Sequence, residues 1–224
     1  MGEMLTLTAE DGFKFSAYRA TPTGKARGAL VIVQEIFGVN HHIKNTTDRF
    51  AAEGYVSLAP ALFDRVEPGF ETGYAPADIE RGRAVRGKVS LEAMVMDLRA
   101  AVKEQQKTGQ KVGVVGYCMG GTMAWLSATR IDGVAGAVGY YGGGIADTCT
   151  EGPRCPVLLH FGETDASIPK EHWDKIRAAH PTVPMHIYPG AGHGFSCDER
   201  GSYHEASHRL ALQRTLDVFH QHVG

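Results

Sequence analysis

The sequence predicts an α/β fold in which helices cover both faces of a mostly parallel sheet. Short runs of consecutive apolar residues, typical of strands buried on both faces, recur along the chain. Segments with apolar residues at helical spacing separate these runs. A chain of 224 residues, 43% of them hydrophobic, can bury one full core. We therefore expect a single domain over residues 1–224.

The first segments are expected to form an edge hairpin followed by a central strand. Residues 4–8 and 13–18 alternate apolar and polar side chains on either side of Asp11-Gly12. The run Ala29-Leu-Val-Ile-Val33 has the continuous apolar character of a buried strand. The chain therefore passes from the edge of the sheet to its core.

Two helices are predicted in the next part of the chain, with an irregular segment between them. Asn40 can cap a helix that ends at Gly54, and residues 55–58 form a strand. Residues 60–89 are rich in Pro, Gly and charge, which indicates an irregular excursion over the edge of the sheet. Apolar residues at helical spacing follow from residue 91 to 109.

The remaining elements continue the alternation of strands and helices. A helix is expected after Thr122, another begins at Pro169, and Ser202 with Glu205 forms a capping box for the last one. The expected strands span residues 112–115, 134–138, 157–161 and 185–188.

Cys118 lies where the strand at 112–115 passes into a helix, in a turn with the spacing of a nucleophile elbow. Gly116 and Gly120 flank it at i−2 and i+2, which matches G-x-S-x-G with Cys in place of Ser. Small residues are needed there because the chain turns sharply, and the N-terminus of the helix favours a thiolate. The alternative is a buried structural cysteine in a glycine-rich turn.

An acid and a base follow later strands, as nucleophilic catalysis requires. Asp165 comes after the strand at 157–161, and His193 lies between two glycines after the strand at 185–188. The chain order of nucleophile, acid and histidine is that of α/β-hydrolases. Glu163 competes with Asp165 as the acid, and Asp is preferred because it is the commoner orienting residue.

Glu35 directly follows the central strand, where a carboxylate is costly unless it is paired. It is expected either to contact Cys118 or His193, or to form a salt bridge. The amides of Met119 and Ile36 lie where the two N–H groups of an oxyanion hole are expected.

Composition and charge favour a small-molecule substrate. A net charge of -2 without a long charged run argues against nucleic acid or a membrane as a partner. The first residues lack the pattern of a signal peptide, so we expect a cytoplasmic protein, a monomer or weak homo-oligomer. The four cysteines lack the spacing of a zinc site or a disulfide framework, so no metal is expected.

Four segments together resemble the dienelactone hydrolase (carboxymethylenebutenolidase) family over nearly the whole chain. They are Gln34-Glu-Ile-Phe-Gly-Val-Asn40, Gly113-Val-Val-Gly-Tyr-Cys-Met-Gly-Gly121, Ala137-Val-Gly-Tyr-Tyr-Gly142 and Gly190-Ala-Gly-His-Gly-Phe195. The resemblance implies an α/β-hydrolase fold without a cofactor and a triad of Cys118, His193 and Asp165. It also implies that the glutamate at position 35 holds the resting thiol and moves when substrate binds.

The resemblance also implies substrate-binding residues. In the family, two arginines bind the substrate carboxylate; Arg83 corresponds to the first, with Arg81 as a near alternative. The second position is occupied by Cys197, with Arg200 nearby, which departs from the pattern. Phe37, Phe195 and Cys197 are the other residues expected to bind substrate.

We therefore expect an enzyme that hydrolyses an activated ester, such as a lactone or enol ester, through an acyl-thioester on Cys118. Three alternatives remain open at this stage. One is a general carboxylesterase or thioesterase for uncharged acyl groups, which the missing arginine favours. The others are a non-catalytic binding protein that keeps a hydrolase pocket and a redox-active thiol with Cys197 as its resolving partner.

Overall fold

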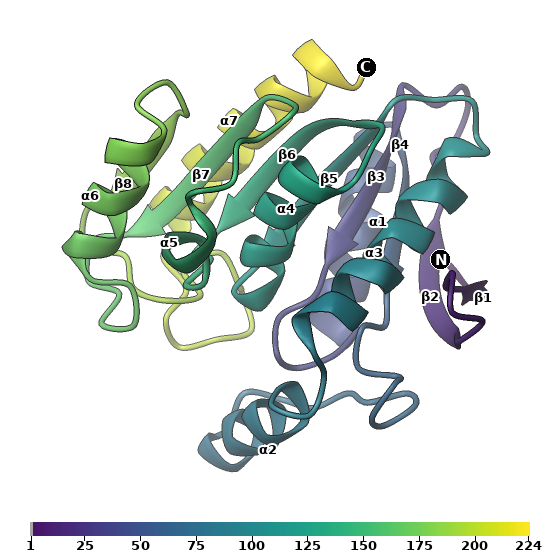
Figure 1. Cartoon of the computed structure of the whole chain (residues 1–224), viewed down its shortest axis with the longest axis horizontal. Helices are drawn as coiled ribbons and strands as arrows, with labels where there is room; N and C mark the ends of the chain where they lie inside the picture. The colour runs from purple at the N-terminus through teal and green to yellow at the C-terminus, as the bar shows by residue number, and fades with distance from the viewer. Residues whose placement is uncertain (1) are drawn as a thin grey trace.

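The computed structural model describes residues 2–224, which build one eight-stranded sheet (Figure 1). The strands lie in the order β1-β2-β4-β3-β5-β6-β7-β8. Their bounds are β1 Glu3–Thr8, β2 Lys14–Ala20, β3 Gly28–Val33, β4 Tyr55–Pro60, β5 Val112–Tyr117, β6 Val134–Tyr140, β7 Val157–Gly162 and β8 Met185–Tyr188.

Strand direction confirms the predicted mostly parallel sheet. β1 and β2 form an antiparallel hairpin at the edge, and β2 also pairs antiparallel with β4. From β4 to β8 every neighbouring pair is parallel. All residues of β3, β5 and β7 are buried, as their continuous apolar runs predict.

Helices cover both faces of the sheet, as expected (Figure 1). α1 and α7 pack on one face, against β4 and β6 among others, and α3 and α4 pack on the other. The helices are α1 His41–Ala52, α2 Pro76–Arg86, α3 Leu91–Gln106, α4 Met119–Arg130, α5 Ile145–Thr148, α6 Lys170–Ala179 and α7 Glu205–His222.

Two predictions about helices were wrong. The segment 60–89 is not irregular throughout, because it contains the eleven-residue helix α2. Only Gly82 and Val85 of this helix are buried, so its sequence shows no apolar stripe. The last helix is not capped by Ser202; it begins at Glu205, and the ring of His204 accepts a hydrogen bond from the Ser207 amide.

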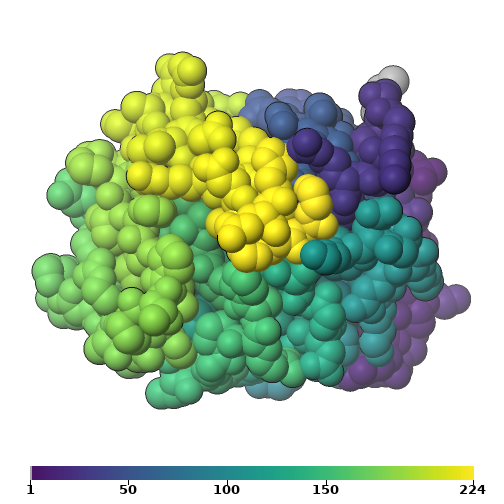
Figure 2. All heavy atoms as spheres, turned by 90° about the horizontal axis from the view of Figure 1, so that it is seen from above, coloured from purple at the N-terminus to yellow at the C-terminus, as the bar shows by residue number. Residues whose placement is uncertain are grey.

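The carboxyl ends of the parallel strands meet at one edge of the sheet, which is the lower end in Figure 1. α2 lies beyond this edge, apart from the two helical layers. Figure 2 shows the opposite end, where the yellow residues of α7 lie beside the purple N-terminal segment. The loops that follow β3, β5, β7 and β8 lie at this edge, and residues from all four line one cavity together with residues of α2. No helix within residues 2–224 has the length and apolar character needed to cross a membrane.

Candidate active site

Cys118 occupies a strained turn between β5 and α4. Its backbone angles are φ 56° and ψ −118°, in the positive-φ region that residues with a side chain rarely adopt. The amide of Cys118 donates to the carbonyl oxygen of Tyr140 at 3.0 Å, and its own carbonyl accepts from the Gly121 amide at 2.9 Å. These bonds hold the turn in a conformation that leaves the thiol half-buried at the start of the helix.

The two glycines that flank Cys118 allow close backbone contacts. A Cβ atom on Gly116 would lie 1.8 Å from the carbonyl oxygen of Gly120. A Cβ atom on Gly120 would lie 2.3 Å from the carbonyl oxygen of Val33. One obstacle is a backbone atom in the first turn of α4 and the other is a backbone atom at the end of β3. Neither can move away without disturbing the elbow.

We expect Gly116→Ala to lower the free energy of unfolding by about 3 kcal/mol or more, because overpacking against backbone forces the strand and helix apart. Urea denaturation of purified protein would measure this loss. Gly152→Ala is the matched control, because a Cβ atom at that position has no neighbour within 4 Å. Equal stability of the two variants would contradict the packing argument.

His193 and Asp165 form the hydrogen bond expected between a base and the acid that orients it. Nδ1 of His193 lies 2.7 Å from Oδ2 of Asp165. The hydroxyl of Ser167 donates to the other carboxylate oxygen of Asp165 at 2.6 Å and lies 3.2 Å from Nδ1 of His193. Glu163, the alternative acid, instead accepts a hydrogen bond from the Gly190 amide. The ring thus turns its Nε2 away from Asp165.

The environment of His193 favours its charged form. Burial lowers the pKa of its imidazole, but hydrogen bonds with Asp165 and Cys118 outweigh burial and raise the pKa to about 10. Burial would raise the pKa of Asp165, but bonding to His193 and Ser167 holds that pKa below its ordinary value. The three groups therefore interact as a chain in which the imidazolium lies between the carboxylate and the sulfur.

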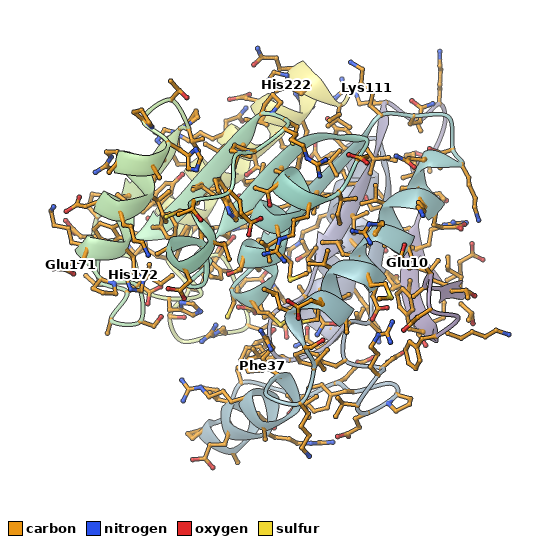
Figure 3. All side chains as sticks on the ribbon, viewed as in Figure 1. Glu10, Phe37, Lys111, Glu171, His172 and His222 are labelled. Atoms are coloured by element: carbon orange, nitrogen blue, oxygen red, sulfur yellow. The ribbon has the colours of Figure 1, made fainter. Side chains whose placement is uncertain are left out.

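Two cavities meet at Cys118, Ser167 and His193, which line both of them. The larger, of about 420 Å³, also contains two cationic side chains, those of Arg83 and Arg200. We call it the cationic cavity; its other lining residues are Ile36, Phe37, Ile79, Asp165 and Ala166. Figure 3 shows Phe37 between the end of the sheet and α2.

The lining of the second cavity, of about 320 Å³, includes three methionine thioethers and one leucine, and we call it the apolar cavity. Arg86 also lines this cavity, which shares the charged imidazole of His193 with the cationic cavity. Its remaining lining residues are Leu91, Met94, Met119, Thr122, Met123, Gly143 and Gly144. A substrate whose carbonyl lies at Cys118 can therefore place one group among charges and the other among apolar side chains.

Glu35 is paired with a cation rather than with the thiol. Its side chain is 1% exposed, and Oε1 accepts a hydrogen bond from Nη1 of Arg200 at 3.2 Å. Burial lowers the pKa of Arg200, but the Glu35 carboxylate and other nearby groups outweigh burial and raise that pKa. Of the two expectations for Glu35, the structure has the salt bridge; within residues 2–224 neither carboxylate oxygen is hydrogen-bonded to Cys118 or His193.

The expected oxyanion-hole residues line different cavities, both of which Cys118 also lines. Ile36 follows β3 and lines the cationic cavity, whereas Met119 begins α4 and lines the apolar cavity. The amide of Met119 belongs to the first turn of α4, where amides lack partners within the helix. Met119 and Ile36 thus flank the junction of the cavities at which a substrate carbonyl would lie.

Three residues expected to bind substrate do not line either cavity. Arg81 is exposed, pairs with Glu67 and stacks on the ring of Phe70. Phe195 is fully buried and packs edge-on against Tyr141. Cys197 is also fully buried, so it cannot contact substrate in this conformation. Burial and the neighbouring Glu35 raise the pKa of the Cys197 thiol to about 12.

Sequence reasoning missed Ser167 and left the reach of Arg200 open. Ser167 follows Asp165 by two residues, and this spacing allows a hydroxyl to bond the preceding carboxylate. Arg200 folds back over the loop that carries His193. Its guanidinium lies so close to Gly194 that a Cβ atom there would be 2.3 Å from Nη1 of Arg200. Only the path of this loop brings Arg200 into the cationic cavity, and no sequence motif marks that path.

The strand order and a nucleophile-type turn at the carboxyl end of β5 define an α/β-hydrolase. The sequence profile described as "Dienelactone hydrolase family" matches residues 15–223. The chain therefore belongs to the dienelactone hydrolase family. It is a hydrolase of ester bonds, and a small-molecule ester substrate fits this family.

Relatives and solved structures agree with this assignment. A carboxymethylenebutenolidase of Pseudomonas putida is 35% identical over 227 residues, which cover 96% of this chain and 94% of that protein. A Synechocystis protein named for the same activity is 35% identical over 96% of this chain and 95% of its own. The crystal structure of a Klebsiella pneumoniae protein assigned as a dienelactone hydrolase superposes with a TM-score of 0.85 at 29% identity, covering 98% of this chain and 100% of that one.

Proposed function

We propose that the protein hydrolyses a carboxylate-bearing lactone or enol ester through a triad of Cys118, His193 and Asp165. The observation that carries the proposal is the cationic cavity, in which Cys118 and His193 face the same space as Arg83 and Arg200. The relatives named carboxymethylenebutenolidase support a lactone that bears a carboxylate. All of residues 1–224 would serve as one catalytic domain.

In the first half of the reaction, the Cys118 thiolate attacks the carbonyl carbon of the substrate. The carbonyl oxygen becomes an oxyanion, which the amides of Met119 and Ile36 stabilise. When the tetrahedral intermediate collapses, the bond from carbon to the leaving oxygen breaks. His193, charged and bonded to Asp165, donates its Nε2 proton to that oxygen. For a lactone, the released enol stays part of the same acyl group.

In the second half, neutral His193 takes a proton from water as the water attacks the thioester. The carbon–sulfur bond breaks, the carboxylic acid is released, and the thiolate and imidazolium are restored. A thiolate leaves the first intermediate more readily than an alkoxide does, so the reaction goes forward only when the leaving oxygen is itself a good leaving group. Lactones of enols meet this condition, whereas amides do not.

The two arginines give the substrate its orientation. Arg200 is held by Glu35 and stacks over the ring of Phe37 at 5.4 Å from its centroid. Arg83 reaches the same cavity from α2. A substrate carboxylate between them would compete with Glu35 for Arg200, and Glu35 would then be free to move. Such a movement agrees with the role that the family resemblance implies for Glu35.

We expect Arg83→Gln to lower kcat/KM for cis- or trans-dienelactone by about 10- to 100-fold, the value of one charge-assisted hydrogen bond. The same change should alter kcat/KM for a neutral nitrophenyl ester less than threefold. Arg81→Gln is the matched control, since it removes the same charge from the same helix but on a side chain that pairs with Glu67 and does not line the cavity. Equal losses for both variants, or for both substrates, would refute carboxylate recognition by Arg83.

A second candidate function is a carboxylesterase for uncharged acyl groups, which the apolar cavity favours. Leu91, Met94 and Met123 form a surface that an alkyl or aryl group could fill. The same experiment separates the candidates. If wild-type protein cleaves the neutral ester but leaves dienelactone intact, the esterase assignment replaces the lactonase assignment.

A further inference from the structure

Behind the cationic cavity lies a cluster of three buried side chains that can all ligate a metal. One ligand atom from each of Glu35, His42 and Cys197 lies within 4.8 Å of the others. The three residues are 1%, 2% and 0% exposed. They come from the end of β3, the first turn of α1 and the loop after β8. Because Cys197 is far from the other two in the sequence, no short spacing motif indicates the cluster.

Two polar atoms of this cluster have no hydrogen-bond partner among residues 2–224. They are Oε2 of Glu35 and Nε2 of His42. Leaving such atoms unpaired in the interior is costly, so each calls for a partner. If Nδ1 carries the ring proton of His42, both atoms have a free lone pair. Two free lone pairs beside a thiol can serve as ligands of a metal cation.

The surroundings of His42 prepare its Nε2 for a metal. Nδ1 of His42 lies 3.1 Å from Oδ1 of Asp198. Arg49 donates a hydrogen bond to the other carboxylate oxygen of Asp198, Oδ2. A carboxylate on Nδ1 fixes the tautomer that leaves a lone pair on Nε2, as in metal-bound histidines of many proteins. The first oxygen of Glu35 is occupied by Arg200, which leaves Oε2 for the same ion.

We propose that Glu35, His42 and Cys197 form a binding site for a divalent transition-metal ion, with Zn²⁺ as the ion that fits best. One thiolate, one imidazole and one carboxylate form a donor set typical of zinc. In a tetrahedral zinc site the ligand atoms are about 3.4–3.7 Å apart. The ligand atoms, which lie within 4.8 Å of one another, therefore need to approach by at most about 1 Å or slightly more. On binding, the Cys197 thiol releases its proton to solvent, and a water molecule supplies the fourth donor of the tetrahedron.

Cobalt titration of chelator-treated, full-length Cys118→Ala protein tests this site without interference from the catalytic thiol. A Co²⁺–thiolate bond gives a charge-transfer absorption in the near ultraviolet, and we expect it to saturate at one equivalent. The band should disappear in Cys118→Ala/Cys197→Ser. It should remain in Cys118→Ala/Cys149→Ser, which removes a buried thiol that instead donates to the carbonyl oxygen of Ala146.

A second variant separates ligation from a general loss of structure. Asp198→Asn, made in the same background, keeps all three ligands but weakens the partner of Nδ1 and the half-exposed ion pair with Arg49. We expect 10- to 100-fold weaker cobalt binding, with a thermal transition within a few degrees of the parent's. Calorimetry with Zn²⁺ should rank the variants in the same order. The site is refuted if the parent variant shows no band, if the band survives Cys197→Ser, or if Asp198→Asn binds as tightly as its parent.

Discussion

Cys118→Ala is expected to abolish esterase and lactonase turnover, with a loss of at least about 10³-fold in kcat. The sulfur is the atom that forms the proposed acyl-enzyme, and the proton transfers by His193 serve the formation and the hydrolysis of that thioester. Steady-state hydrolysis of dienelactone and of a nitrophenyl ester measures the loss. Intact-mass spectrometry with a slowly hydrolysed ester should show an acyl adduct on wild-type protein and none on the variant.

The control for this variant is its folding. Alanine keeps the strained backbone at φ 56° and removes only a half-buried sulfur. The thermal transition should therefore move by no more than a few degrees. A Cys118→Ala protein that turns over substrate like the wild type would rule out covalent catalysis at this residue, whatever its stability.

Asp165→Asn is expected to lower kcat by about 10³- to 10⁴-fold, because an amide no longer holds the imidazole in the required tautomer and charge. It should also change the pH profile. The bond to Asp165 raises the pKa of His193, which is about 10 in the native protein. Activity needs the proton on His193 and should fall as pH rises through that value. Loss of the carboxylate should therefore move the alkaline limit of kcat/KM to lower pH.

Glu163→Gln is the matched control for this change. Glu163 lies two residues from Asp165, but its carboxylate accepts from the Gly190 amide rather than from His193. Its kcat and alkaline limit should stay close to those of the wild type. An alkaline limit that moved with Glu163→Gln but not with Asp165→Asn would assign the orienting role to Glu163 instead of Asp165.

The fold follows from the sequence wherever burial imposes a pattern. The strands β3, β5 and β7 are buried on both faces, so their continuous apolar runs identify them. The helix α2 buries only two residues, so periodicity could not reveal it. A Pro at its first turn followed by Asp78 was the available signal. The cap of α7 is a histidine ring, a residue type that cap preferences do not predict.

The candidate site follows from the sequence only in part. Cys118, Asp165 and His193 could be placed because each lies directly after a strand, and parallel strands end at one edge of the sheet. Phe195 and Cys197 could not be placed, because side chains in an irregular loop have no fixed alternation between inside and outside. Both point into the interior. The pairing of Arg200 with Glu35 joins positions far apart in the chain and required the three-dimensional path of the loop.

The helix α2 separates specificity from chemistry. It presents Arg83 to one cavity and Arg86 to the other, yet only Gly82 and Val85 anchor it in the interior. Mutations along its outer turns therefore cost little stability and leave the elbow of Cys118 untouched. Replacing the sequence of α2, by evolution or by directed selection, would thus change the substrate range of the enzyme while Cys118, His193 and Asp165 stay as they are.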